Sequence, residues 1–168
     1  GQQILCPFYL KWRNMLRRCY SPEYKKLKPT YIDCTVCDKW LNFSEFKAWM
    51  EKQDWKGSEI DKDLLFVGNK IYSPDTCAFV DGVTNKFITD RAADRGACAI
   101  GVYFEESTGI LQAYCNNPFT KKQERMGRLK DEISAHLAWK KRKHELACQL
   151  AELQTDERVA AALRVRYL

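Results

Sequence analysis

The first apolar pattern along the chain has the period of an α-helix. Between residues 7 and 20 the basic side chains lie opposite an apolar stripe, which consists of Phe8, Trp12, Met15, Leu16 and Cys19. Spacings of three and four residues place side chains on one helix face, so an amphipathic helix is predicted there. A shorter helix is predicted after Asn42, because Asn42 and Glu45 have the spacing of a capping box.

The segments around these helices predict turns and strands. Two prolines mark residues 21–30 as a loop. Residues 30–40 are rich in Thr, Ile, Val and Tyr, which favour a strand. Residues 60–72 are predicted to form a β-hairpin, because their Gly68-Asn69 pair is typical of a two-residue turn.

The second half of the chain has a different pattern. Residues 96–117 contain short apolar runs separated by turns, which predict two or three strands. A long helix is predicted over residues 131–153, and a last helix follows, with Thr155 or Asp156 as its cap. The apolar stripe of the long helix consists of Ala135, Ala138, Trp139, Leu146, Leu150 and Leu153. We therefore expect an α+β protein.

Length and composition limit the class of protein. The chain has 168 residues, 45% of them hydrophobic, which is enough for one compact domain or two small ones. We divide it into residues 1–90 and 91–168. It contains no apolar run of about 18 residues and no visible secretory signal, so neither a membrane partner nor export is expected. A cytoplasmic protein is the expectation.

The positive charge is clustered. The formal net charge is +6. Three basic clusters stand out, before residue 30, over residues 121–130 and at residues 140–143. Basic side chains interleaved with aromatic ones favour a polyanionic partner, since each phosphate contact releases condensed counterions. The alternative is a solvated surface that keeps the protein soluble. From these clusters we select as candidate DNA contacts Arg13, Arg17, Arg18, Lys121 and Lys122.

The eight cysteines raise the question of a metal. Cys34 and Cys37 form a CxxC pair, which is half of a zinc site, but no second pair follows. We favour reduced thiols over a structural Zn²⁺, which would also need Cys6, Cys19 or Cys77. The two histidines, His136 and His144, are eight residues apart on the predicted long helix, too far for one metal, and we interpret them as surface or packing residues.

Residues 31–87 carry the first resemblance to a known family. Trp40, Phe43 and Phe46 precede "IDKD", which is followed by "YSPDTCAFVDGVTN". This order resembles the HNH endonucleases of bacteriophages, which have a ββα-metal core. The resemblance implies a nuclease site in which Asp61 and Asn85 hold Mg²⁺ or Mn²⁺. Asp61-Lys62 stands where relatives have an Asp-His pair, and Asp63 follows it. The catalytic candidates are Asp61, Lys62, Asp63 and Asn85.

Lys62 is the departure from the family pattern. The histidine of the family is the general base, and its ordinary pKa of about 6.5 suits that role. A lysine has an ordinary pKa of about 10.4, so Lys62 would need burial that lowers its pKa by several units. Either Lys62 stabilises charge on the phosphate while hydroxide or Asp63 acts as base, or the nuclease frame is degenerate and only binds DNA. A third reading is a hairpin with solvated charges.

Residues 95–139 carry a second resemblance. The stretches "RGACAIGVYF", "GILQAYCNN" and "GRLKDEISAHLAW" resemble the AP2 DNA-binding module, which often follows an HNH module in phage homing-type endonucleases. The resemblance implies a three-stranded antiparallel sheet in the DNA major groove, packed on a long C-terminal helix. The matching positions that would face the duplex are Arg95, Tyr103, Gln112, Tyr114 and Asn116.

Together the two resemblances define the expected architecture and function. We expect an N-terminal helix, a ββα-metal-like centre, and an AP2-like sheet with a long C-terminal helix. The leading expectation is a phage endonuclease or nickase that acts on double-stranded DNA in an infected bacterial cell. The alternative is a catalytically degenerate DNA-binding or protein-interaction factor used during infection.

Overall fold

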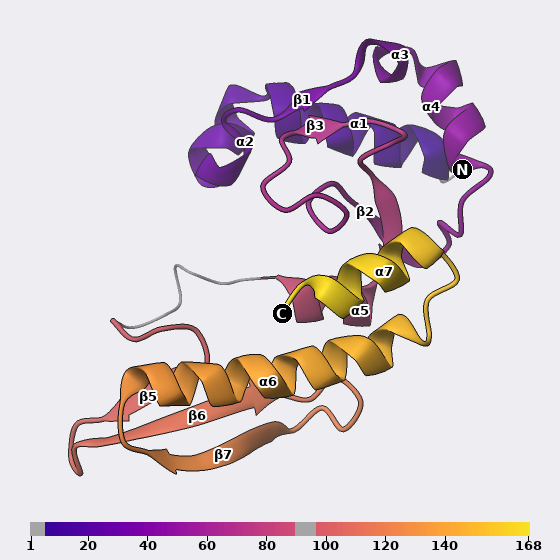
Figure 1. Cartoon of the computed structure of the whole chain (residues 1–168). Coiled ribbons are helices and arrows are strands. Elements are labelled where there is room, and N and C mark those ends of the chain that lie inside the picture. Colours follow the sequence, from indigo (N-terminus) through magenta and orange to yellow (C-terminus); the bar gives the residue numbers. More distant parts are fainter. Residues whose placement is uncertain (1–5, 90–96) are drawn as a thin grey trace, which may run out of the picture. The chain divides into compact units, whose positions relative to one another are not determined.

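The computed structural model describes residues 6–89 and 97–168 (Figure 1). By its internal contacts the chain forms two compact units, Gly1–Gly82 and Val83–Leu168. The fold is mixed α+β, and the three-stranded antiparallel sheet and the long C-terminal helix are as expected. Within the described residues, no helix combines the length and apolar character needed to cross a bilayer.

The first unit combines short helices with two small sheets. Its elements are α1 (Pro7–Tyr20), α2 (Pro22–Leu27), the 3-10 helix η1 (Pro29–Tyr31), β1 (Thr35–Val36), α3 (Asp38–Leu41), α4 (Phe43–Met50), β2 (Ser58–Asp61), β3 (Ile71–Tyr72) and β4 (Ala78–Asp81). β1 pairs with β3 in parallel, and β2 pairs with β4 in antiparallel orientation.

The two helices predicted in this unit are confirmed. α1 buries Met15 and Cys19 from its apolar stripe. α4 begins after Asn42, whose side-chain oxygen accepts a hydrogen bond from the backbone N–H of Ser44 at 2.8 Å. An N-cap of this kind satisfies a backbone donor that the helix itself leaves unpaired.

Aromatic and sulfur-containing side chains fill the core of the first unit. Trp40 and Phe46 meet edge to face with their centroids 5.2 Å apart, a favourable geometry for aromatic pairs. The indole N–H of Trp12 donates to the carbonyl oxygen of Trp40 at 2.7 Å and ties α1 to α3. The buried residues of this core are Met15, Cys19, Cys34, Val36, Trp40, Phe46, Met50, Ile60, Tyr72, Cys77 and Phe79.

Three local predictions in this unit are wrong. Residues 60–72 are not a hairpin, because β2 pairs with β4 and β3 pairs with β1. Within residues 30–40 only Thr35 and Val36 are strand, and α3 begins at Asp38. The stretch predicted as a loop contains α2, where Ser21 caps the helix and Pro22 occupies its first position, which needs no N–H donor.

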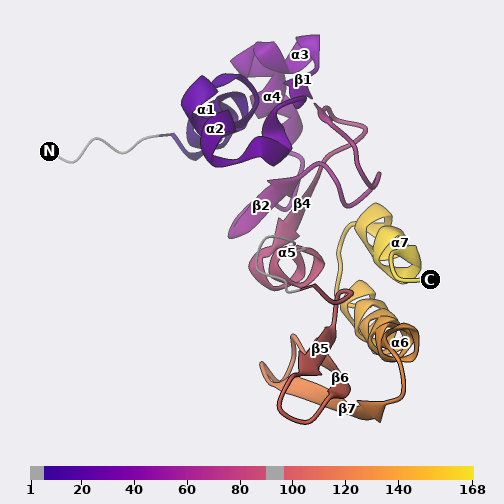
Figure 2. The ribbon, with the colours of Figure 1, turned by 90° about the vertical axis from the view of Figure 1, so that its left-hand side faces the viewer.

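The second unit is a sheet covered by a long helix. Its elements are α5 (Gly82–Ile88), which begins at the division, β5 (Val102–Glu105), β6 (Ile110–Asn116), β7 (Gln123–Leu129), α6 (Glu132–Ala151) and α7 (Glu157–Val165). The sheet order is β5-β6-β7, and both pairings are antiparallel. α6 runs along one face of this sheet (Figure 1, Figure 2), and α7 packs on α6.

Burial explains which parts of the helix predictions hold in the second unit. Trp139 and Leu146 lie on the buried face of α6, as predicted. Leu153 does not, because α6 ends at Ala151 and Leu153 is exposed. Asp156 caps α7 by accepting from the backbone N–H of Arg158 at 2.9 Å.

Gly101 allows α6 to lie close to the sheet. Its φ is +81°, and a Cβ atom at this position would lie 2.0 Å from Cγ of Trp139. Nearby, Nδ1 of His136 lies 3.0 Å from the carbonyl oxygen of Ile100. The start of the sheet is therefore fixed against α6 by a packing contact that only glycine permits.

Candidate functional site

Asp61, the first predicted nuclease residue, ends β2 and organises the turn that follows. Its Oδ1 accepts hydrogen bonds from the backbone N–H groups of Asp63 at 2.8 Å and Leu64 at 2.6 Å. Aspartate often stabilises turns in this way. One carboxylate oxygen of Asp61 therefore has a structural role in the first unit.

Lys62 is buried and ties the ends of a loop together. Only 6% of the residue is exposed. Its Nζ donates to Oδ1 of Asp63 at 2.6 Å and to the carbonyl oxygen of Asn69 at 2.9 Å. Asn69 returns a bond, since its Nδ2 donates to the carbonyl oxygen of Lys62 at 2.8 Å. The carbonyl oxygens of Lys62 and Asn69, which a hairpin would have paired between its strands, are therefore hydrogen-bonded within the loop.

The surroundings of Lys62 keep its amine protonated. Burial acts to lower the pKa of Lys62, but the hydrogen bond and negative charge of Asp63 outweigh it, and the pKa is raised above its ordinary value. A general base at neutral pH needs a lowered pKa. Burial of this lysine therefore does not produce the base that the nuclease hypothesis requires.

Asn85, the fourth predicted nuclease residue, lies on α5. Asp61, Lys62 and Asp63 belong to the first unit and Asn85 to the second. The backbone carbonyl of Asn85 accepts from the hydroxyl of Thr89 at 2.7 Å. The pairing of Asp61 with Asn85 around a metal stays a prediction from the resemblance.

The cysteines of the described residues are free thiols. Cys34 is buried, and its Sγ lies 3.7 Å from the carbonyl oxygen of Thr30, whereas Cys37 is half-buried. In residues 6–89 and 97–168, no three His, Cys, Asp or Glu side chains gather as a group that could hold a metal ion.

The sheet of the second unit has one face toward α6 and one face away from it. Directly paired residues of antiparallel strands share a face. Tyr103 pairs with Gln112, Gln112 with Arg128, and Tyr114 with Arg125. The alternate residue Glu124 points to the α6 side, where its carboxylate binds Arg142 at 2.6 Å. We call the face away from α6 the outer face, and it carries Tyr103, Gln112, Tyr114, Asn116, Gln123, Arg125 and Arg128.

A β-bulge places both arginines on the outer face. Residues three apart on a regular strand point to opposite faces. The register shifts between Gln112 and Tyr114, so two residues of β7 stand opposite one residue of β6. Gly127, with a φ of +92°, lies in this bulge. The shift brings Arg125 and Arg128 to the same side, and both are exposed.

A hydrogen-bond chain fixes the centre of the outer face. The hydroxyl of Tyr114 donates to Oε1 of Gln112, and Nε2 of Gln112 donates to Oε2 of Glu105 at 3.2 Å. Gln112 is only 2% exposed, so its amide serves the sheet and is not presented to a partner. This differs from the expected role of Gln112 as a residue facing the duplex.

Aromatic rings and guanidinium groups form the exposed part of the outer face. Tyr103 is 56% exposed, and its ring lies 6.4 Å from that of Tyr114. The guanidinium carbon of Arg125 lies 6.0 Å from the centroid of the Tyr114 ring, at the limit of a cation–π contact. Tyr103, Tyr114, Arg125 and Arg128 therefore form a combined aromatic and cationic surface.

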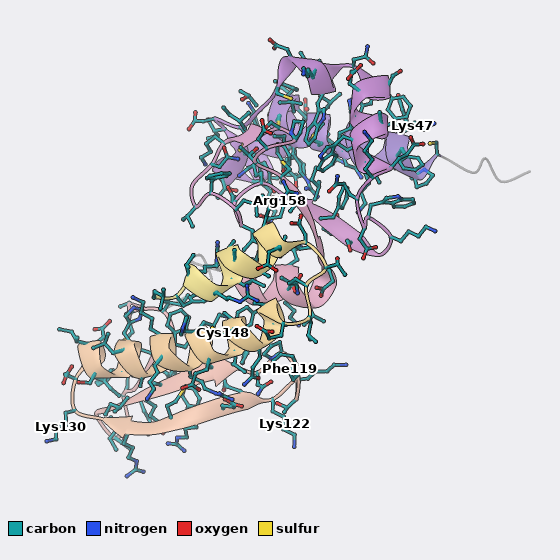
Figure 3. The ribbon with its side chains drawn as sticks, turned by 45° about the vertical axis from the view of Figure 1, so that its right-hand side comes forward. Lys47, Phe119, Lys122, Lys130, Cys148 and Arg158 are labelled. Carbon is teal, nitrogen blue, oxygen red and sulfur yellow. The ribbon has the colours of Figure 1, made fainter. Side chains whose placement is uncertain are left out.

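Basic residues continue the charge beyond the sheet face. Lys122 and Lys130 flank the two ends of β7, and their side chains extend away from the ribbon (Figure 3). Lys121 is exposed in the β6–β7 loop with a φ of +58°, and Asn116 is exposed at the end of β6. Arg95, also a predicted DNA contact, lies outside the described residues.

The three predicted arginine contacts on α1 differ in their surroundings. Arg13 is exposed, and Arg17 is exposed with its guanidinium carbon 5.4 Å from the centroid of the Tyr24 ring. Arg18 is half-buried. Burial acts to lower the pKa of Arg18, but its interaction with the Tyr72 hydroxyl outweighs this and raises it. Arg18 thus contributes to the packing of the first unit.

Arg125 and Arg128 were recognised in the sequence only as members of a basic cluster. Their place on the sheet depends on β7, which the apolar pattern does not mark because "QERMGRL" is mostly polar. The usable signal is Gly127 between two arginines, since glycine within a strand often marks a bulge.

No family model, no curated protein and no solved structure matches the chain.

Proposed function

We propose that this protein binds double-stranded DNA through the outer face of the β5-β6-β7 sheet. The observation that carries the proposal is the bulge at Gly127, which brings Arg125 and Arg128 to the face that also presents Tyr103 and Tyr114. The resemblance to the AP2 module supports the same face.

The chemistry of the outer face suits a duplex. Arginine side chains contact phosphates and can bind guanine edges with two hydrogen bonds. The contact of Arg125 with the Tyr114 ring and the bond from Tyr114 to Gln112 restrict these side chains before binding. Less conformational freedom is then lost when DNA binds.

Titration of a labelled duplex at several salt concentrations tests this proposal. Arg125→Ala and Arg128→Ala should each weaken binding and reduce the slope of log affinity against log salt by about 1. Lys52→Ala, which removes an exposed charge from the first unit, is the control and should leave the affinity within about twofold.

The double variant gives the decisive comparison. If Arg125→Ala/Arg128→Ala binds the duplex as tightly as the unmodified protein, the outer face is not the interface. Stronger binding to an RNA hairpin or a single strand than to the duplex would also overturn the proposal, since it is specific to double-stranded DNA.

Phosphodiester hydrolysis is a second candidate function. It is favoured by the order of β2, β4 and α5, two antiparallel strands followed directly by a helix, with Asp61 ending β2 and Asn85 on α5. Carboxylate and amide oxygens are ligands that Mg²⁺ or Mn²⁺ accepts, and such an ion would supply Lewis-acid activation of the phosphate. In this function Lys62 holds the loop and remains an ammonium ion. Action in the cytoplasm of an infected bacterial cell stays a prediction.

Plasmid cleavage tests the second function. Nicking of supercoiled DNA in Mg²⁺ or Mn²⁺ that disappears in Asp61→Ala and in Asn85→Ala would support it. Nicking that survives both substitutions would exclude this site. No nicking, together with salt-sensitive binding, would leave DNA binding as the function.

A further inference from the structure

His144 and Cys148 form a pair that the proposed DNA interface does not use. They are one helical turn apart on α6, and Cys148 is labelled there in Figure 3. Nε2 of His144 lies 3.6 Å from Sγ of Cys148. Both residues are half-buried in the second unit.

The separation of the two atoms matches the geometry of a zinc site. Zinc binds imidazole nitrogen at about 2.05 Å and thiolate sulfur at about 2.3 Å in a tetrahedral arrangement. Two such ligands at the tetrahedral angle are separated by about 3.6 Å, by simple trigonometry on those bond lengths. The observed distance of 3.6 Å equals this separation.

The two nitrogens of His144 differ in their surroundings. Nδ1 is buried, and in the part of the chain that the structure describes it has no hydrogen-bond partner. Nε2 is the nitrogen that faces the sulfur of Cys148. The ring is thus oriented with one nitrogen directed at the thiol and the other withdrawn from solvent, which leaves Nε2 as the ligand atom.

Other thiols of the chain lack this setting. Burial raises the pKa of Cys19 and of Cys77 to about 12, and it also raises the pKa of Cys115. Metal ions bind the thiolate form of cysteine, so a raised pKa opposes binding. Cys148 instead combines partial exposure with an adjacent imidazole.

We infer that His144 and Cys148 form a two-residue chelate for a borderline-soft divalent cation, with Zn²⁺ as the best-fitting ion. Nε2 and Sγ occupy two corners of the tetrahedron, and water takes the other two. No third His, Cys, Asp or Glu of the described residues joins the group. The pair thus differs from the closed four-ligand sites that are structural.

Protection of the thiol from alkylation tests this chelate in the intact 168-residue chain. The protein is treated with N-ethylmaleimide with and without added Zn²⁺, and each cysteine is followed by peptide mass spectrometry. Zn²⁺ should slow alkylation of Cys148 about tenfold or more, as expected when a metal occupies the thiolate. Cys98 is the internal control, because it is half-buried like Cys148 but lies outside α6, away from His144.

The His144→Gln variant separates a chelate from a metal bound by sulfur alone. The inference requires that Zn²⁺ protection of Cys148 is lost in this variant while its thermal unfolding stays close to that of the unmodified protein. Co²⁺ should give thiolate-to-metal absorption in the unmodified protein and not in His144→Gln or Cys148→Ser.

Two results would overturn the inference. One is equal alkylation of Cys148 with and without Zn²⁺, which together with faster alkylation than that of Cys98 would identify an imidazole-activated thiol instead of a metal site. The other is protection that persists in His144→Gln.

Discussion

Nζ of Lys62 lies 2.6 Å from Oδ1 of Asp63, and the lysine side chain is only 7% exposed. The same Nζ donates to the carbonyl oxygen of Asn69, seven residues further along the chain. A charged lysine is rarely buried without a partner, and here the partners close a loop. The residue that stands where a nuclease would have its histidine is therefore part of the folded frame.

Replacement of Lys62 should destabilise the protein. Lys62→Met keeps much of the side-chain volume but leaves the carbonyl oxygen of Asn69 without its buried donor, and we expect a loss of about 1–3 kcal/mol in unfolding free energy. Urea denaturation measures it. Lys52→Met is the control, since Lys52 is exposed and should change stability by less than about 0.5 kcal/mol. Equal effects of the two substitutions would contradict the role of Lys62.

The raised pKa of Lys62 predicts how its contribution to stability changes with pH. The pKa of Lys62 is raised in the folded state, so its contribution to stability is complete below the ordinary lysine value of 10.5. It is lost only as the pH rises through the raised pKa. A stability difference between the unmodified protein and Lys62→Met that already vanishes near neutral pH would contradict this.

Gly101→Ala should strongly destabilise the second unit. A Cβ at Gly101 would meet the Trp139 ring, and its φ of +81° is unfavourable for alanine. Overpacking and left-handed strain together cost about 2–4 kcal/mol. Gly109→Ala is a matched control, because Gly109 has a φ of +67° and no atom within 4 Å of the added Cβ. It should cost only about 1–2 kcal/mol, and thermal unfolding distinguishes the two.

Glu124 predicts sensitivity to acid. Its hydrogen bonds from Arg142 and Asn117 lower the pKa of Glu124 from 4.5 to about 2. Between pH 2 and pH 4.5 the unfolded chain binds more protons than the folded chain does. The stabilisation by the hydrogen bonds of Glu124 is therefore complete above pH 4.5 and is lost as the pH falls toward 2. In Glu124→Gln this part of the acid transition should disappear. Glu145→Gln, at the more exposed partner of Arg142, should leave it in place.

Lys143 predicts the opposite pH trend. Its Nζ donates to the carbonyl oxygen of Phe87 at 2.7 Å, and burial lowers the pKa of Lys143 from 10.5 to about 8. Between pH 8 and 10.5 the unfolded chain therefore binds the additional proton, so this residue's contribution to stability increases with pH. The stability of the unmodified protein relative to Lys143→Met should rise over that range. A flat difference would show that Lys143 keeps an ordinary pKa.

Periodic and capped segments were predictable from the sequence. The stripe of α1, the Asn42 cap of α4 and the long α6 follow from local spacing and capping chemistry, which need little information from distant residues. The hairpin prediction over residues 60–72 is wrong although the chain does turn at Gly68. A turn is a local feature and does not determine which strands pair. Gly68 does adopt a positive φ, yet β2 and β3 take partners far along the chain.

The candidate sites were predictable to a smaller extent. The resemblance to the AP2 module selected Tyr103, Gln112 and Tyr114, which do share one sheet face, but Gln112 is buried and its amide donates to Glu105. Arg125 and Arg128 required knowledge of the β7 register. The His144–Cys148 pair has the spacing of adjacent helical turns, and its signal was missed because His144 was compared only with His136.

The bulge in β7 also sets how the strand tolerates length changes. A strand alternates between two faces, so one inserted residue acts as a half-period shift of everything beyond it. Deleting Gly127 by a single codon would restore a regular alternation between Arg125 and the following arginine. The two arginines, then two residues apart, would still share the outer face, whereas a regular strand of the present length would turn one of them toward α6. The position of both arginines on one face of this sheet thus depends on the number of residues between them as much as on their identity.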